Sequence, residues 1–216
     1  QAKAKEVEHQ FPMPLLKFPK VWPELSNRHI LVMEHIKAPT LESRLANKDL
    51  SWEDLLQLFR IHGAYMFGIG TFHGDLHPGN AMVDSDGMFT FIDTGAISHA
   101  PESVRSALFG FFYYLAKGEL EDAFEAMLTM ADTPPTGEAK ARYMREMHET
   151  YDGFVGKSVS EVSLTQQMMK TVRIAVLAGC RFGEEAFPII RSLMYMDGMV
   201  LRGHPEVDLI SSMGPY

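Results

Sequence analysis

Residues 73–80 read His-Gly-Asp-Leu-His-Pro-Gly-Asn, and residues 89–95 read Phe-Thr-Phe-Ile-Asp-Thr-Gly. Between them, Ala-Met-Val at 81–83 leads into an Asp-Ser-Asp-Gly turn. Two short apolar runs on either side of an Asp-Gly turn predict a β-hairpin. Such a hairpin places Asn80 at the start of one strand and Asp93 at the end of the other, so we expect these two side chains to converge.

The polar residues of this stretch have the spacing of a kinase active site. Asn80 follows Asp75 by five positions and Asp93 follows Asn80 by thirteen, as in the pattern H-R-D-L-x-x-x-N with a later D-F-G. Gly74 replaces the Arg and Thr94 replaces the Phe. Phosphoryl transfer needs positioning and charge neutralisation more than covalent chemistry. We therefore predict Asp75 as the catalytic base or water-orienting residue, Asn80 and Asp93 as Mg²⁺ ligands, and ATP as the cosubstrate.

Two histidines in the loop allow other roles. His73, Asp75 and His77 are also ligand types for zinc or a metal pair in a hydrolase, but that alternative leaves Asn80 and Asp93 unexplained. In the kinase-like interpretation, His73 is expected to hold the loop by hydrogen bonds. His77 either shapes the turn or faces a phosphate of the nucleotide.

Composition limits the class of protein. The 216 residues are 46% hydrophobic, with 14 Phe and 15 Met, enough for a sizeable core. The net charge of -8 argues against non-specific nucleic-acid binding. The single cysteine, Cys180, excludes an intrachain disulfide and is expected to be a buried structural thiol. The sequence shows no secretory signal and no apolar run long enough to span a bilayer.

The residues before the loop predict a strand and two helices. The apolar run at residues 29–36 predicts a buried strand that ends in a hinge. Thr40 and Ser51 are expected to cap the helices that follow them. The backbone groups expected to face adenine at the hinge belong to Met33, Glu34, His35 and Ile36.

After Gly95 the pattern is helical throughout, with Gly and Pro as punctuation. The predicted fold class is α+β and mainly helical, a protein-kinase-like C-terminal lobe with short β-hairpins around the catalytic loop. Residues 1–36 are assigned to the end of an N-lobe and the hinge strand, and residues 37–216 to the C-lobe. The expected helices span residues 102–116, 120–130, 138–154, 164–178 and 184–200.

The upstream part of the chain lacks the parts of a complete N-lobe. No glycine precedes Gly63, so no glycine-rich phosphate loop is present in this sequence. The early lysines lie in no strand that resembles a phosphate-binding Lys site. An uncovered hinge would leave apolar surface, which predicts self-association on that side.

Three stretches carry a resemblance to a known family, the UbiB (AarF) atypical kinases of ubiquinone biosynthesis. Residues 21–34 resemble the family's segment entering the hinge, residues 73–80 its catalytic loop, and residues 92–97 its metal-binding loop. The resemblance extends from about residue 21 to 132. Many members have Ala-Asp-Pro where this chain has Gly-Asp-Leu at 74–76.

The resemblance implies a function and a place. It implies an ATP-binding, Mg²⁺-dependent ATPase or lipid-linked kinase that supports quinone synthesis, in contact with lipid or quinone-pathway components. It also implies a location in the cytoplasm or on the mitochondrial matrix side, peripheral to the inner membrane.

Two other functions stay open. One is an aminoglycoside-phosphotransferase-like small-molecule kinase, for which an acidic pocket should bind a cationic substrate. The acidic residues 119, 121, 122 and 125 have helical spacing, which is more typical of a solvated face. The other is a non-catalytic, truncated kinase lobe that acts as a binding module.

Overall fold

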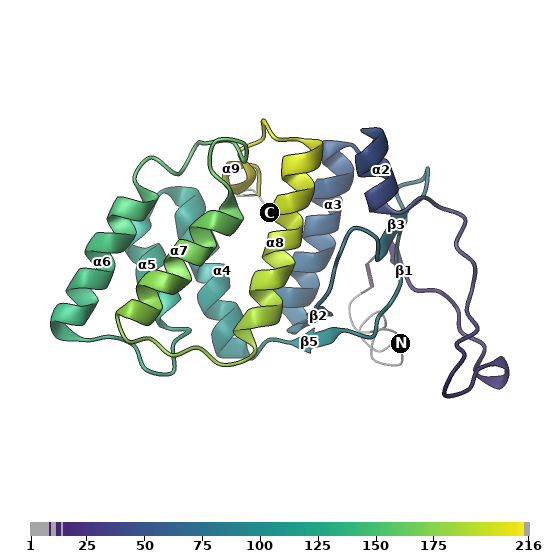
Figure 1. The fold of residues 1–216 in the computed structure, drawn as a ribbon, viewed down its shortest axis with the longest axis horizontal. Helices are drawn as coiled ribbons and strands as arrows, with labels where there is room; N and C mark the ends of the chain where they lie inside the picture. Colours follow the sequence, from purple (N-terminus) through teal and green to yellow (C-terminus); the bar gives the residue numbers. More distant parts are fainter. Residues whose placement is uncertain (1–8, 10–11, 14, 214–216) are drawn as a thin grey trace.

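The structure, a computed structural model, describes residues 9, 12–13 and 15–213. Helices predominate among them, and Figure 1 shows the long helices side by side, with the short strands gathered at one end. Residues 1–8, 10–11 and 14 of the segment assigned to an N-lobe lie outside the described part.

The strands form two small sheets. In one, β4 (Phe89–Phe91) pairs in parallel with β1 (Leu16–Lys17) and antiparallel with β3 (Ala81–Val83). In the other, β2 (Thr71–His73) pairs antiparallel with β5 (Ile97–His99). The β3–β4 pair confirms the predicted hairpin, while β1 and the β2–β5 pair were not predicted. The β2–β5 pair brings the residues before the catalytic loop against those after Asp93.

Two capped helices precede the loop. The side chain of Thr40 caps α2 (Leu41–Asn47), as predicted. Ser51 and Asp54 form a reciprocal capping box at the start of α3 (Trp52–Gly63), which satisfies backbone groups that a helix end otherwise leaves without partners.

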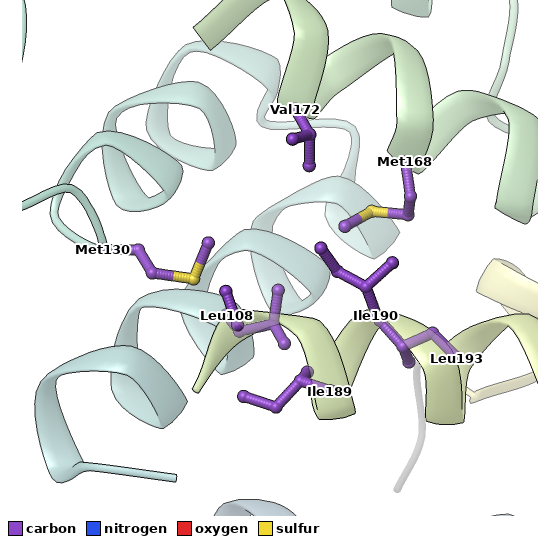
Figure 2. Close-up of a pocket in the computed structure, with 8 residues that line it drawn as sticks. Leu108, Met130, Met168, Val172, Ile189, Ile190 and Leu193 are labelled. Carbon is purple, nitrogen blue, oxygen red and sulfur yellow. The ribbon is translucent and has the colours of Figure 1, made fainter. Parts of the chain in front are cut away.

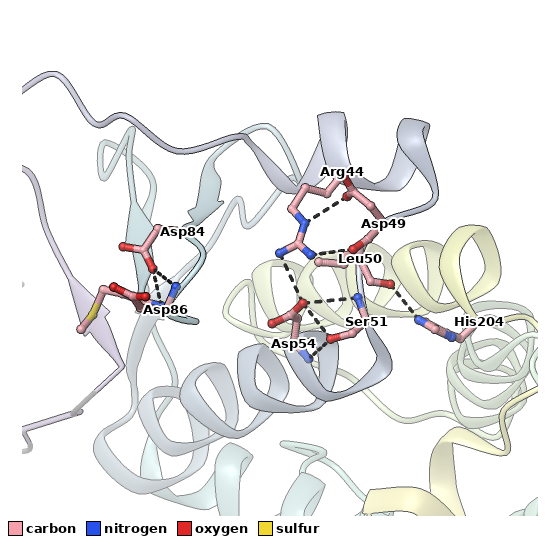
Figure 3. A network of polar contacts seen from close by, with 9 residues as sticks. Arg44, Asp49, Leu50, Ser51, Asp54, Asp84, Asp86 and His204 are labelled. Carbon is pink, nitrogen blue, oxygen red and sulfur yellow. Dashed lines mark hydrogen bonds and ion pairs between the residues drawn. The ribbon is translucent and has the colours of Figure 1, made fainter.

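A polar network fastens the corner between these helices (Figure 3). The Arg44 guanidinium pairs with Asp49 at 3.0 Å and with Asp54 at 3.3 Å. Nearby, the His204 ring lies 2.9 Å from the carbonyl oxygen of Leu50. The corner between α2 and α3 is therefore held by ion pairs among its own residues and by the contact with His204, which follows the long helix at residues 186–203.

An unusual helical turn follows α3. Residues Ala64–Ile69 form a π-helix, a feature frequent at functional sites. It ends at Gly70, whose φ of 77° suits glycine. The Arg105 side chain donates from Nη1 to the carbonyl oxygen of Phe67 at 3.1 Å and also to that of Gly68. The helix thus ends at a glycine just before β2.

The predicted helices after Pro101 are present, with ends within three residues of those expected. A short last helix was not predicted. None of the described helices is long and apolar enough to cross a membrane. The helices are α4 (Glu102–Lys117), α5 (Leu120–Leu128), α6 (Gly137–Tyr151), α7 (Leu164–Leu177), α8 (Ala186–Gly203) and α9 (Leu209–Met213).

An apolar pocket lies between α4, α7 and α8 (Figure 2). Leu108, Met168 and Ile189 are among the side chains that line it, and all of the lining residues are apolar. The pocket offers no charged or hydrogen-bonding side chain to a nucleotide.

Cys180, which follows α7, is buried as expected.

The prediction of a buried strand at residues 29–36 was wrong. The segment forms no regular strand, and its one bridge joins Met33 to Val21. Ile30 and Leu31 are 58% and 61% exposed. Figure 1 shows this part of the chain as an extended loop beside β1, away from α4 to α7. A strand needs paired neighbours to bury its apolar side chains, and the described chain supplies one bridge only.

Candidate active site

The loop at residues 73–80 begins where β2 meets β5. The Gly74 N–H donates to the carbonyl oxygen of Ala96 at 2.7 Å. A Cβ at Gly74 would lie 2.0 Å from Oγ of Ser98 and 2.9 Å from the Ala96 oxygen. The close approach of two chain segments therefore favours glycine at this position.

His73 joins the two halves of the site. Its Nδ1 accepts a hydrogen bond from the Asp75 N–H at 3.2 Å. Its Nε2 lies 3.2 Å from the carbonyl oxygen of Ile92. With Nδ1 as acceptor, Nε2 carries the proton and donates to Ile92. The predicted structural role of His73 is confirmed.

Asp75 is partly buried and has a partner from the far end of the chain. The Tyr195 hydroxyl on α8 donates to its Oδ1 at 2.8 Å. This hydrogen bond raises the pKa of the Tyr195 phenol, so the phenol keeps its proton at neutral pH. Asp75 thus retains Oδ2 for a further interaction.

Asn80 contacts both neighbouring segments. Its Nδ2 donates to the carbonyl oxygen of Asp75 at 3.0 Å. Its own carbonyl oxygen accepts from the Ile92 N–H at 2.9 Å. The first bond points the side-chain nitrogen toward the loop and leaves Oδ1 as the free acceptor. The second places the residue before Asp93 directly beside Asn80.

Asp93 adopts an uncommon backbone conformation. Its φ of 53° lies in the left-handed region, which only Gly, Asn and Asp visit readily. The residue is exposed, and its carboxylate has no hydrogen bond or ion pair with any described residue. The structure therefore brings the backbone next to Asp93 against Asn80 through Ile92, while convergence of the Asn80 and Asp93 side chains stays a prediction.

The donor set fits Mg²⁺. Asn80 offers an amide oxygen and Asp93 a carboxylate, and Mg²⁺ prefers oxygen ligands shared with substrate phosphates. These two residues stay the predicted metal ligands. The zinc alternative is disfavoured, because both His73 nitrogens are engaged with backbone groups. In the described part of the chain, no three His, Cys, Asp or Glu side chains are grouped to hold a metal.

His77 lies at the exposed end of the loop. Its Nδ1 accepts from the Gly79 N–H at 3.0 Å, which shapes the turn. Its ring meets the Tyr195 ring edge-on, with centroids 5.6 Å apart. The next residue, Pro78, connects the loop to α2, because its carbonyl oxygen accepts a hydrogen bond from the Glu42 N–H at 3.0 Å. The turn-shaping role is therefore present, and contact with a phosphate stays a prediction.

Sequence reasoning missed the support that α8 gives the loop. The Nε of Arg191 donates to the carbonyl oxygen of Gly74 at 2.9 Å, and Nη2 donates to the same oxygen. The Ser192 hydroxyl lies 3.5 Å from the carbonyl oxygen of His73. With Tyr195, these residues form one turn of helix facing the loop. Their spacing of one and four positions is the only local signal, and it is common in helices.

The predicted hinge residues lie on the exposed loop. Met33, Glu34 and His35 are exposed, and Ile36 is half-buried. The Glu34 N–H donates to the carbonyl oxygen of Lys20 at 2.8 Å, next to the bridge between Val21 and Met33. In this pairing, the backbone N–H and C=O of Met33 point away from Val21. Contact of these two groups with adenine stays a prediction.

The acidic cluster on α5 does not form a substrate pocket near the loop. Glu121 lies 2.8 Å from the His148 ring, and Glu125 pairs with Lys140 at 2.6 Å, both partners being on α6. Figure 1 shows α5 and α6 at the opposite end of the molecule from β2 and β3. The cluster is a solvated helix face, as its spacing indicated.

Comparison with known proteins agrees with this geometry. The model of the ABC1 atypical kinase-like domain matches residues 1–127. The chain is 26% identical over 212 residues to the chloroplastic protein Activity of bc1 complex kinase 3 of Arabidopsis thaliana, covering 92% of this chain and 28% of the relative. It is 22% identical over 213 residues to the probable protein kinase UbiB of Histophilus somni (strain 129Pt), covering 94% of this chain and 38% of the relative.

A solved complex of Rv3197 with erythromycin, from Mycobacterium tuberculosis, superposes with a TM-score of 0.49 at 14% identity, covering 93% of this chain and 55% of that one. The chain spans 28% and 38% of the length of the two curated relatives named above. The family model covers more than half of the chain, and the resemblance predicted from residues 73–80 and 92–97 is confirmed. The chain belongs to the ABC1 atypical kinase-like family.

Proposed function

We propose that the chain forms the catalytic-loop side of a Mg²⁺-ATP-dependent phosphoryl-transfer or ATP-hydrolysing centre. Asp75 takes the proton of the attacking hydroxyl or water, while Asn80 and Asp93 would hold the Mg²⁺, which would supply neutralisation of phosphate charge. As the new O–P bond forms, the bond from the γ-phosphorus to its bridging oxygen breaks, and the electron pair leaves with ADP. The backbone at residues 33–36 contacts adenine.

One observation carries the proposal. The His73 ring bonds at one end to the Asp75 backbone and at the other to the Ile92 carbonyl, beside the bond between Asn80 and Ile92. These bonds lock the loop of the proposed base to the loop of the proposed metal ligand. Precise mutual placement of base and metal is what phosphoryl transfer asks of a protein.

The metal arm of the test uses Mn²⁺ as a paramagnetic probe in place of Mg²⁺. Asp93→Asn keeps the left-handed backbone accessible but removes the charge. We expect it to weaken Mn²⁺–ATP binding by about tenfold or more. Asp86→Asn, in the exposed hairpin turn 84–87, is the matched control and should bind as the wild type does. Equal binding by all three proteins would remove Asp93 from the site.

The catalytic arm measures ATP hydrolysis by the protein as the cell makes it. Asp75→Asn should lower kcat roughly 10²–10⁴-fold, the usual contribution of a general base. The affinity for Mn²⁺–ATP should be unchanged, since Asp75 is not a proposed ligand. Full turnover by Asp75→Asn would exclude Asp75 as the base.

The role of the whole protein is a wider proposal. The resemblance to the UbiB kinases supports a place in ubiquinone biosynthesis. Deletion of the gene should lower cellular quinone, and the Asp75→Asn form should fail to restore it. Normal quinone in the deletion strain would assign the centre to another process.

A further inference from the structure

One turn of α8 contacts three consecutive residues at the start of the catalytic loop. Ser192 approaches the His73 carbonyl, Arg191 binds the Gly74 carbonyl, and Tyr195 binds the Asp75 carboxylate. The first two contacts fix the backbone of the loop. The third reaches a side chain, and it is the only one of the three that touches the proposed base.

The Tyr195 hydroxyl has a defined role as donor. Asp75 is an acceptor when ionised, so the phenol must supply the proton of their 2.8 Å hydrogen bond. The Tyr195 ring is held in turn by its edge-on contact with the His77 ring, at an interplanar angle of 87°. Both ends of the phenol are therefore fixed by residues of the loop itself.

We infer that Tyr195 is a positioning residue for the proposed base. Its hydroxyl occupies Oδ1 of Asp75, fixes the carboxylate rotamer and leaves Oδ2 for the proton of the attacking group. The inference rests on the proposed function and adds to it a residue 120 positions away along the chain. A base that rotates freely is correctly placed for part of the time only, so loss of the hydroxyl lowers the rate.

The test compares Tyr195→Phe with a matched control in the protein as the cell makes it. Tyr195→Phe removes the hydroxyl and keeps the ring against His77. Tyr113→Phe makes the same change on the exposed face of α4. We expect kcat for ATP hydrolysis to fall about 10- to 100-fold in Tyr195→Phe, as when the partner that orients a functional group is lost. KM for ATP and the melting temperature should match those of Tyr113→Phe.

A double-mutant cycle separates positioning from packing. If Tyr195 acts through Asp75, adding Tyr195→Phe to Asp75→Asn should lower kcat no further. A purely structural role of Tyr195 would lower kcat by the same factor in both backgrounds. That additive result would overturn the inference.

A readout without turnover follows the contact itself. The Asp75 hydrogen bond is the largest cause that raises the pKa of Tyr195. In NMR titrations of ¹³Cζ-labelled tyrosine, Asp75→Asn should therefore lower the pKa of the Tyr195 phenol, while Asp86→Asn should not. If the pKa of the Tyr195 phenol were the same in Asp75→Asn as in the wild type, the contact would be absent.

The outcomes distinguish the two proposals. Wild-type turnover with an unchanged kcat in Tyr195→Phe would overturn the positioning role and leave the proposed function standing. No turnover and no Mn²⁺–ATP binding by the wild type would overturn the proposed function, and the positioning role with it.

Discussion

The guanidinium of Arg191 donates to the carbonyl oxygen of Gly74, 117 residues earlier in the chain, from both Nε and Nη2. The contact makes the geometry of the catalytic loop depend on α8. Helix α8 is itself fastened to α7, whose first turn is capped by Asp197. The position of Asp75 therefore depends on the packing of α7 and α8, and substitutions that destabilise either helix should displace the loop.

Gly74→Ala should destabilise the fold by about 1–3 kcal/mol, the usual cost of overpacking. The new methyl group would meet Oγ of Ser98 and the carbonyl oxygen of Ala96. Urea unfolding measures the change. Adding Ser98→Gly should restore part of the loss, because it removes the side-chain clash but leaves the backbone one. Wild-type stability of Gly74→Ala alone would show that β2 and β5 separate freely.

Asp197→Ala should cost about 2–4 kcal/mol, since it removes three hydrogen bonds and leaves buried donors without acceptors. The carboxylate accepts from the Ser163 hydroxyl at 2.7 Å and from the N–H groups of Leu164 and Thr165. The control is Asp208→Ala, which removes a similar cap at the surface, where Asp208 bonds Ser211. It should cost about 1 kcal/mol. An equal loss of unfolding free energy in the two variants would show that burial of the Asp197 hydrogen bonds does not increase their contribution to stability.

The stability of the fold should fall in mild acid because of His62. The ring is fully buried, and its two nitrogens have no hydrogen-bond partner among the described residues. Burial lowers its pKa from 6.5 to about 3. Between these values the unfolded chain binds the proton and the folded one does not, so stability is complete above pH 6.5 and decreases as the pH falls toward 3.

The measurement is urea unfolding at pH 7 and pH 5. His62 should contribute a loss of about 2 kcal/mol between them, at about 1.4 kcal/mol per pH unit. His62→Leu should remove this part of the slope. His148→Leu, which removes an exposed imidazole, should keep it. A His62→Leu protein with the wild-type slope would place the acid sensitivity elsewhere.

Asp93→Ala should lower the stability by about 1 kcal/mol, because alanine pays the steric cost of the left-handed backbone without a polar side chain to offset it. Asp93→Asn should be neutral, since asparagine tolerates this conformation. Thermal unfolding of the two variants without metal or nucleotide measures the difference. Equal stability of the two would show that the backbone relaxes out of the left-handed region.

The local parts of the fold followed from the sequence. The turn at residues 84–87 and its apolar flanks specified the β3–β4 hairpin, and the side chains of Thr40 and Ser51 specified two helix starts. These features depend on neighbours a few residues apart. The roles of Asp75, Asn80 and Asp93 stay predictions that rest on spacing and on the bonds between their loops.

The parts that the sequence could not indicate depend on distant partners. The run at residues 29–36 has strand composition, but only a pairing strand makes it a strand, and Val21 supplies a single bridge. Arg191 and Tyr195 carry no local mark of their role, because their partners lie 117 and 120 residues away. The β2–β5 pair likewise joins segments separated by the whole catalytic loop.

The contacts of α8 with the loop also set an order of events during synthesis. A ribosome adds about 5–20 residues per second, so roughly 6–23 seconds pass between Gly74 and Arg191. In that interval the residues of the β3–β4 hairpin have been synthesised, but the residues of α8 that contact the Asp75 loop have not. An incomplete translation product that ends before α8 would therefore carry the sequence of residues 73–80 without the contacts from Arg191 and Tyr195 that hold this loop.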